Sequence, residues 1–234
     1  RPSQDLVHIM YEGVQEDAME YIQKLLQEAL SLAARCTGKE LWRHQCSQCD
    51  FSRPAHRPEE FTVTSLSLTT ENTMGTEVTL TSVSDALAAH LRKHEQVQLD
   101  EWTCGSATCP AYDLPRFDPL QMHTVIAAPE TLVLHLKRWR TRPDGPPDLL
   151  GHPVVPDEEV RLGDARYSLR SIISHEGRDP RSGHYVAIVK TASKWWLCND
   201  SIVHEATAEQ RRAGCRENCG GRVYILMYEK LAIG

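Results

Sequence analysis

The stretch Tyr167–Val203, YSLRSIISHEGRDPRSGHYVAIVKTASKWWLCNDSIV, decides the fold. Its apolar runs predict three strands, separated by a loop rich in Gly, Pro and Arg and by a short turn. The second strand opens with His184, and the third ends in the polar pair Asn199 and Asp200. Because a hairpin brings these strand ends together, the stretch predicts a histidine base oriented by a carboxamide or a carboxylate. The alternative is a surface histidine beside a turn-forming pair.

Motifs along the chain extend this interpretation. Within the quoted stretch the pattern consists of Tyr167, Leu169, His175, Gly177, Gly183, His184, Tyr185, Trp196, Asn199, Asp200 and Val203. Further motifs are the segments Gln15–Tyr21, Leu132–Trp139 and Val223–Tyr228. In this order they resemble the motifs of the ubiquitin-specific proteases (USPs), a family of cysteine deubiquitinases. The resemblance runs from about Gln15 to Tyr228 and covers nearly the whole chain.

The resemblance implies an α+β fold, that of a papain-like cysteine protease of USP type. Such a domain has an antiparallel-sheet palm and zinc-ribbon fingers, and here it would keep a remnant of the thumb helix. On this division, residues 1–35 form the thumb-helix remnant, residues 36–115 the fingers, and residues 116–234 the palm with the histidine motif.

Hydrophobic periodicity supports the division. A helix is predicted from Gln15 to about Ala34, because apolar residues recur at helical spacing at Ala18, Ile22, Leu25, Ala29 and Leu32. A core strand is predicted over Leu132–Trp139, because its leucines occupy alternate positions. We interpret Lys137 and Arg138 in this strand as sheet-edge or salt-bridging residues.

The resemblance also implies a reaction, the hydrolysis of the isopeptide or peptide bond after the C-terminal glycine of ubiquitin. In this reaction a thiolate attacks the carbonyl carbon, and a histidine takes the proton and returns it. His184 matches the base of the family. Asn199 matches the residue that orients the base, and Asp200 is the alternative.

Other residues match positions around the ubiquitin tail. Asp17 matches an acidic residue that contacts the tail, and an ordinary acid at a helix N-terminus is the alternative interpretation. Tyr185 is expected to line the narrow tail cleft. The segment His175–Ser182 matches a mobile lid, in which Gly177 and Gly183 would supply hinge freedom.

The nucleophile motif of the family, of the type Asn-x-x-Cys-Tyr, does not occur ahead of Gln15. We therefore expect the nucleophile upstream of this segment and expect these residues alone to be inactive. Cys36 and Cys198 are internal candidates, but neither follows the strand-to-helix setting that exposes and activates a thiolate. A catalytically inactive ubiquitin-binding module and a zinc-ribbon protein-interaction module are the alternatives.

Two cysteine pairs predict a structural zinc site. Cys46 and Cys49 are separated by two residues, and Cys104 and Cys109 by four. Short gaps let two thiolates face one ion, so two such pairs supply the four sulfurs of a tetrahedral Zn²⁺ site. His44 is an alternative ligand. We interpret the later pair, Cys215 and Cys219, as part of an exposed loop.

The composition is that of a globular protein, with 41% hydrophobic and 25% charged residues among 234. No run of about 18 apolar residues appears, so no membrane span and no membrane partner are predicted. The net charge of −6 argues against nucleic acid as the main partner. We expect a monomer that binds ubiquitin and ubiquitinated proteins. Thiolate ligands favour a reducing compartment, the cytoplasm or the nucleus.

Overall fold

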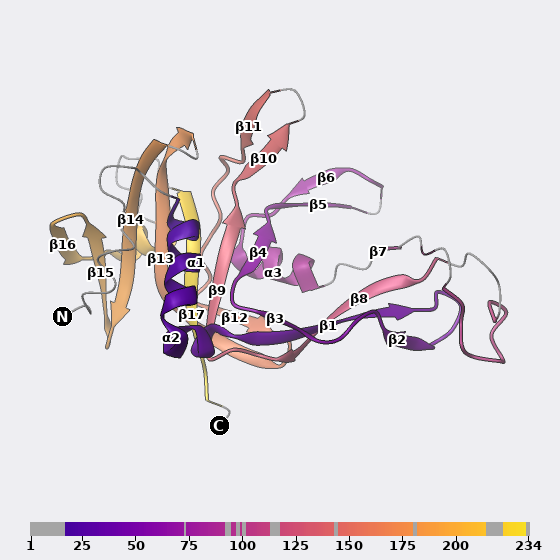
Figure 1. Ribbon diagram of the computed structural model, residues 1–234. Coiled ribbons are helices and arrows are strands. Elements are labelled where there is room, and N and C mark those ends of the chain that lie inside the picture. Colours follow the sequence, from indigo (N-terminus) through magenta and orange to yellow (C-terminus); the bar gives the residue numbers. More distant parts are fainter. Residues whose placement is uncertain are drawn as a thin grey trace.

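The computed structural model describes residues 17–72, 74–91, 95–96, 99, 102–112, 118–142, 145–179, 182–213 and 222–232. A broad sheet with its helices forms one part, the palm, and a long arm, the fingers, extends from its side (Figure 1). The expected α+β fold is confirmed. Among the described residues, no helix has the length and apolar character needed to cross a membrane.

The palm is built on an eight-stranded sheet in the order β16-β15-β14-β13-β17-β9-β4, with β12 paired to β13 outside this path. All of these neighbours are antiparallel except β4 and β9, which are parallel. The strands are β4 (Thr64–Ser67), β9 (Thr131–Lys137), β12 (Glu159–Leu162), β13 (Ala165–Asp179), β14 (Ser182–Thr191), β15 (Lys194–Asn199), β16 (Ile202–Glu205) and β17 (Arg222–Lys230).

The two faces of this sheet pack against different elements. One face joins α3 (Val83–Leu91) in the main core, where Leu134, Ile172 and Ile188 are fully buried. The other face carries α1 (Ala18–Glu28) and α2 (Leu30–Cys36) in a smaller cluster (Figure 1). Because successive side chains of a strand point to opposite faces, one strand contributes residues to both cores. This explains why the sequences of these strands are apolar at nearly every position.

The N-terminal helical segment is two helices, because the chain breaks at Ala29 (φ −93°, ψ 76°). The buried residues of α1 are Met19, Ile22 and Leu26. The predicted stripe is therefore wrong at Leu32, which lies beyond the break, while Leu25 and Ala29 are half-buried. Leu32 is 38% exposed, and Cys36 is the buried residue of α2.

The fingers are a second sheet, in which β1 (Gly38–Gln45) pairs with β2 (Ser52–Pro54), β3 (Glu59–Phe61) and β8 (Leu120–Ala127), and β7 (Glu95–Gln96) pairs with β8. The chain runs out along β1, returns to place β4 in the palm, and later runs back along β8 (Figure 1). Smaller elements are β5 (Thr69–Glu71), β6 (Glu77–Thr79), β10 (Trp139–Arg142), β11 (Gly145–Leu149) and α4 (Ala208–Ala213).

Gly38 lies at the root of the fingers. A Cβ added there would lie 2.4 Å from the Phe61 ring and 2.9 Å from the carbonyl oxygen of Ala127. Real Cβ atoms are not found so close to other heavy atoms, so only glycine lets β1, β3 and β8 meet at this point.

Arg138, predicted to be a sheet-edge or salt-bridging residue, is instead buried. Its guanidinium donates hydrogen bonds to the carbonyl oxygens of Val223 (2.9 Å), Leu150 (3.1 Å) and His152 (2.7 Å). Burial and the charge of Arg222 lower the pKa of Arg138 to about 10. The side chain therefore ties the end of β9 to β17 and to the connecting segment after β11.

Candidate active site

His184 and Asn199 meet where two neighbouring strands of the palm end. His184 lies near the start of β14, Asn199 is the last residue of β15, and the strands begin to pair at Ala187 and Cys198. The Oδ1 of Asn199 accepts a hydrogen bond from Nε2 of His184 at 2.6 Å. This bond places a proton on Nε2 and leaves Nδ1 as the basic nitrogen. The predicted juxtaposition is observed.

Asp200 lies farther from the imidazole. Its Oδ2 is 3.9 Å from Nε2 of His184, and its side chain is 81% exposed. Asp200 has a φ of +50° in the turn between β15 and β16, a conformation that Asp tolerates better than most residues. The hydrogen-bond partner of His184 is therefore Asn199, while the Asp200 side chain is largely exposed to solvent.

Asp17 caps α1 and joins it to the palm. Its Oδ1 accepts a hydrogen bond from the backbone N–H of Met19 at 2.7 Å. Its Oδ2 accepts from the hydroxyls of Tyr224 (2.7 Å) and Tyr185 (3.4 Å). Burial is the main cause that raises the pKa of Tyr224, and the hydrogen bond to Asp17 and the charge of Asp17 raise it further. The Tyr224 hydroxyl therefore stays protonated and remains a donor. Sequence reasoning missed Tyr224, whose only signal was its place in the closing strand.

Removing the Asp17 carboxylate is expected to destabilise the fold by about 2 kcal/mol. The helix cap contributes about 1 kcal/mol, and the buried hydroxyl of Tyr224 would lose its acceptor. Urea unfolding of the Asp17→Ala variant measures this loss. Glu20→Ala is the matched control, because Glu20 is exposed in the same helical turn, and its effect should stay within about 0.5 kcal/mol. Equal effects of the two substitutions would show that the contacts of Asp17 carry no stability.

The segment His175–Ser182, predicted to be a loop, continues the two strands as a hairpin. Glu176 pairs with His184, and Asp179 pairs with Ser182. The backbone therefore positions His184 through its pairing with Glu176, beside a shift in register between Glu176 and Asp179.

The two glycines of this hairpin meet a close neighbour. Gly177 and Gly183 have φ angles of +153° and +152°. A Cβ at Gly183 would lie 2.3 Å from the carbonyl oxygen of Glu176 and 2.4 Å from Nε2 of His175. One at Gly177 would lie 2.7 Å from the carbonyl oxygen of Ser182 and 2.9 Å from Cε1 of His175. The close approach of the opposite strand's backbone and of the His175 ring requires both glycines. The expected mobility of this segment stays a prediction.

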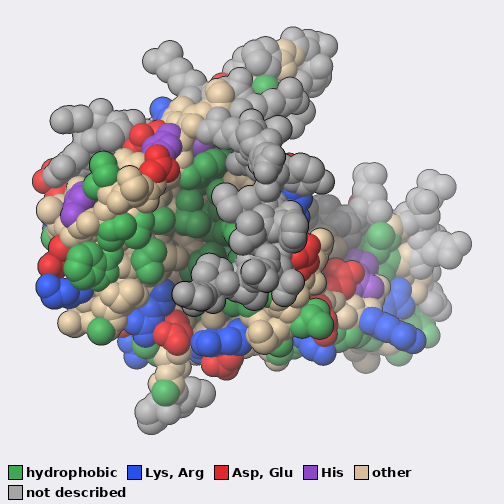
Figure 2. All heavy atoms as spheres, turned by 60° about the vertical axis from the view of Figure 1, so that its left-hand side comes forward, with side chains coloured by type: hydrophobic (Ala, Val, Ile, Leu, Met, Phe, Trp, Pro, Cys, Tyr) green, Lys and Arg blue, Asp and Glu red, His purple; other side chains and the backbone are tan. Residues whose placement is uncertain are grey.

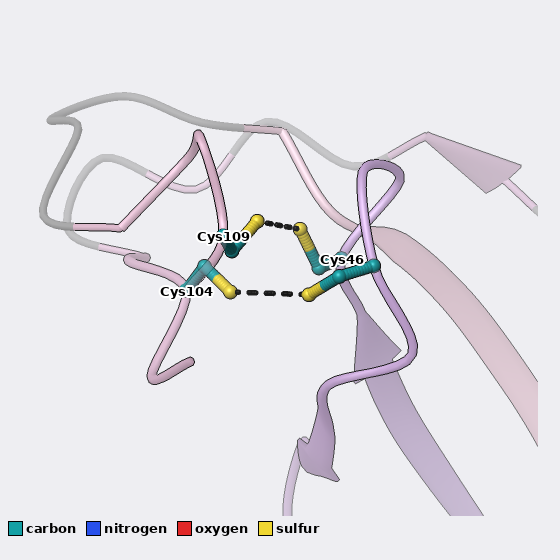
Figure 3. A group of neighbouring side chains, drawn as sticks. Cys46, Cys104 and Cys109 are labelled. Carbon is teal, nitrogen blue, oxygen red and sulfur yellow. Dashed lines mark hydrogen bonds between the residues drawn. The ribbon is translucent and has the colours of Figure 1, made fainter. Parts of the chain in front are cut away.

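The four cysteines predicted as metal ligands come together at the end of the fingers (Figure 3). Their Sγ atoms all lie within 4.8 Å of one another. Cys46 and Cys109 are 3.7 Å apart, and Cys49 and Cys104 are 3.6 Å apart. Four sulfurs at the usual Zn–S distance of about 2.3 Å are about 3.8 Å from one another, so the group fits a tetrahedral Zn²⁺. His44 is not part of this group.

The surroundings of the cysteines suit thiolate ligands. The backbone N–H groups of Gln48 and Ala111 donate to the sulfurs of Cys46 and Cys109, both at 3.4 Å. Burial raises the pKa of Cys109 to about 12, so this thiol keeps its proton unless a metal displaces it. The other predicted cysteine pair, residues 215 and 219, lies outside the described residues.

The face turned forward in Figure 2 carries histidine and acidic side chains beside a broad hydrophobic area. The exposed apolar residues of β16 are Ile202, which is 62% exposed, and Val203, which is 56% exposed. Apolar surface of this kind suits contact with another polypeptide better than contact with a small polar molecule.

Comparison with known proteins identifies the class. The family model described as ubiquitin carboxyl-terminal hydrolase matches residues 4–228, so the chain belongs to this family. Ubiquitin carboxyl-terminal hydrolase 4 of Arabidopsis thaliana is 34% identical over 116 residues, which are 44% of this chain and 32% of that protein. Ubiquitin carboxyl-terminal hydrolase 46 of Caenorhabditis elegans is 36% identical over 87 residues, 33% of this chain and 20% of that protein.

Solved structures show the same fold. The Ubp8 DUB module of SAGA bound to monoubiquitin matches with a TM-score of 0.75 and 19% identity, covering 94% of this chain and 50% of that chain. The Ubp8/Sgf11/Sus1/Sgf73 module bound to ubiquitin aldehyde matches with a TM-score of 0.74 and 20% identity, over the same shares. The chain thus spans about half the length of these structures and a third or less of the curated relatives described above.

Proposed function

We propose that this chain is the base-bearing part of a thiol-dependent deubiquitinase. The substrate bond is the isopeptide or peptide bond after the C-terminal glycine of ubiquitin, and the nucleophilic cysteine comes from upstream of this segment. The observation that carries the proposal is the 2.6 Å hydrogen bond between His184 and Asn199, in a chain of the ubiquitin carboxyl-terminal hydrolase family.

His184 serves as the base and then as the acid. Its Nδ1 takes the proton from the cysteine thiol, and the thiolate attacks the carbonyl carbon of the ubiquitin C-terminus. The protonated ring then donates to the leaving amine, and water releases ubiquitin in a second cycle. Asn199 holds Nε2–H, so the ring keeps one tautomer and one orientation. The 39% exposure of the His184 side chain leaves it open to a partner group.

The cysteines among the described residues are poor nucleophiles. Cys36 is buried under α1, and burial raises the pKa of its thiol. Cys198 lies in the middle of paired strands, opposite Ala187 and Val203. The remaining four form the sulfur cluster of the fingers. These positions support a nucleophile from another segment.

The proposal includes partners and a metal. Ubiquitin and ubiquitinated proteins are the ligands, as the ubiquitin-bound Ubp8 structures suggest by their fold. Asp17, Tyr185 and Gly183 are proposed to lie along the ubiquitin tail. One structural Zn²⁺ would be held by the four sulfurs of the fingers. The proposed location is the cytoplasm or the nucleus, and a monomeric state stays a prediction, since those neighbours lie in complexes with other subunits.

A ubiquitin probe with a C-terminal electrophile tests the function in the full-length protein. We expect a covalent adduct on a cysteine upstream of residue 1, located by mass spectrometry of the labelled peptide. The His184→Ala variant should form the adduct far more slowly. A folded, zinc-loaded protein that binds ubiquitin without forming an adduct would support the alternative, an inactive ubiquitin-binding module. A folded protein that neither forms the adduct nor binds ubiquitin would support the other alternative, a zinc-ribbon interaction module.

Asn199 and Asp200 are distinguished by paired substitutions. Asn199→Ala removes the acceptor of the 2.6 Å bond and is expected to lower kcat by about 10- to 100-fold, because ring orientation is lost. Asp200→Ala removes an exposed charge and should change kcat by about threefold or less. Steady-state cleavage of a fluorogenic ubiquitin amide measures both. The reverse ranking would assign the orienting role to Asp200.

A further inference from the structure

A hollow of about 660 Å³ lies between α3 and the hairpin formed by β12 and β13, and no step of the proposed reaction uses it. Four residues of α3 line the hollow at helical spacing, Ser84, Leu87, Ala88 and Leu91. Because α3 joins the main core, it packs on the sheet face opposite α1 and α2. The hollow is therefore separate from the face on which α1 lies.

The floor of the hollow is apolar. Leu87 is 1% exposed and Val160 is 3% exposed, and both belong to the main core. Leu91 is half-buried and packs against the same core. An aliphatic side chain that enters the hollow would therefore rest on the surface of a packed core and would itself be removed from water.

The rim of the hollow carries two arginines on neighbouring strands. Arg161 of β12 and Arg166 of β13 are directly opposite each other in the antiparallel register, and both are exposed. Side chains at such positions lie on one face of the sheet, where like charges repel. Glu159 compensates only Arg166, whose Nη2 lies 2.7 Å from its Oε2. The side chains that line the hollow thus carry two positive charges and one negative charge.

Arg161 has no role in the fold that explains its presence. Within the described part of the chain, no carboxylate pairs with it and its guanidinium donates no hydrogen bond. Its charge opposes the pairing of β12 with β13, because Arg166 faces it. Residues whose local effect opposes the fold are expected at functional sites. The position of Arg161 therefore indicates contact with another molecule, one that carries negative charge.

The lining of the hollow defines the chemistry of that molecule. A guanidinium binds a carboxylate through two parallel hydrogen bonds, and the floor suits an aliphatic side chain. A peptide with acidic residues beside Leu, Ile or Val offers both. The volume lies within the range of ligand pockets. Nucleic acid fits less well, because the net charge of the chain is −6 and the described lining residues include no aromatic ring for stacking.

We propose that this hollow is a docking site for a short acidic peptide segment of a partner protein. An aliphatic side chain of the segment rests on Leu87 and Val160, and its carboxylates pair with Arg161 and Arg166. A partner bound there leaves the sheet face that carries α1 uncovered. The proposal is independent of the proposed function, because it involves neither His184 nor Asn199.

A phage-displayed library of short random peptides tests the class of ligand. The library is selected on the immobilised full-length protein, after removal of phage that bind a variant with both Arg161→Gln and Arg166→Gln. We expect the enriched peptides to combine acidic residues with Leu, Ile or Val. Enrichment of basic or purely apolar peptides, or no enrichment over the starting library, would overturn the proposal.

The most enriched peptide is then titrated against single variants by fluorescence anisotropy. Arg161→Gln should raise Kd by about 10-fold or more, because a charge-assisted hydrogen bond is lost. Ala88→Trp should raise Kd at least as much, because its larger side chain fills the hollow. Arg57→Gln is the matched control, since Arg57 is an exposed arginine of the fingers outside the hollow, and its Kd should stay within about twofold of wild type. Equal affinities of wild type and Arg161→Gln would overturn the proposal.

The stability of Arg161→Gln separates a ligand contact from a structural role. Because the substitution relieves the repulsion from Arg166, the urea midpoint of the peptide-free protein should equal that of wild type or rise. Added peptide should raise the midpoint of wild type and of Arg57→Gln more than that of Arg161→Gln. A peptide-free midpoint of Arg161→Gln clearly below that of Arg57→Gln would show that Arg161 serves the fold, and its assignment to a ligand would be wrong.

Discussion

Replacing His184 with Gln in the full-length protein should lower kcat for ubiquitin cleavage by about 10²- to 10⁴-fold, the usual contribution of a general base. Gln preserves side-chain size and polarity but cannot take a proton at neutral pH. KM should change little, because the ring contacts Asn199 rather than a large binding surface. Initial rates with a fluorogenic ubiquitin amide give both constants.

The control for this substitution is His204→Gln. His204 is an exposed residue of β16, in the same sheet as β14, and its Nδ1 lies 3.1 Å from the carbonyl oxygen of its neighbour Glu205. We expect its kcat to stay within about twofold of wild type. If His184→Gln retains wild-type kcat while remaining folded, another group must serve as the base, and the proposed mechanism is wrong.

Loss of the metal is expected to unfold the end of the fingers. Binding free energies in small zinc domains are about 10 kcal/mol or more, and much of this free energy stabilises the fold. We expect one zinc per chain by elemental analysis, and none after Cys104→Ser or strong chelation. Hydrogen exchange of the metal-free protein should accelerate around the two cysteine pairs and along β1 and β8, with little change in β13, β14 and β17.

Cys198→Ser is the control for Cys104→Ser. Both exchange sulfur for oxygen, but Cys198 lies in the palm and outside the sulfur cluster. The Cys198→Ser protein should keep its zinc and the slow exchange of its fingers. Full zinc content and unchanged exchange in Cys104→Ser would show that the four sulfurs do not form a metal centre.

The sequence predicted the structure correctly where the local pattern and the order of the strands determine which residues meet. Alternating apolar residues and the polar ends of two strands were enough to bring His184 next to Asn199. Short spacing within each cysteine pair was enough to group the sulfurs. His184 and Asn199 lie on neighbouring strands of one hairpin, so chain order brings them together. The four cysteines share a preference for one metal ion, which permits few other arrangements.

Other features depend on contacts that no local pattern reveals. Asp17 and Tyr224 are 207 residues apart in sequence, and only the packing of α1 on the sheet brings them together. Arg138 is buried although arginine is usually exposed, because its guanidinium is hydrogen-bonded to main-chain carbonyl oxygens and not to a carboxylate.

Local sequence also misled where it gave no signal or an ambiguous one. The break between the two N-terminal helices falls at Ala29, where the sequence has neither Gly nor Pro to indicate it. The sequence predicted a loop at Gly177 and Gly183, where the structure has a hairpin. A glycine needed for close packing cannot be told in the sequence from one that provides flexibility.

The crowded contact at Gly38 fixes the angle at which the fingers leave the palm. Any side chain there would have to push apart Phe61 and Ala127, on the two strands that flank β1. A small rotation at that point would be magnified along β1 and β8 into a large displacement of the sulfur cluster at the far end. A side chain at position 38 is therefore expected to change the position of the four cysteines relative to the palm.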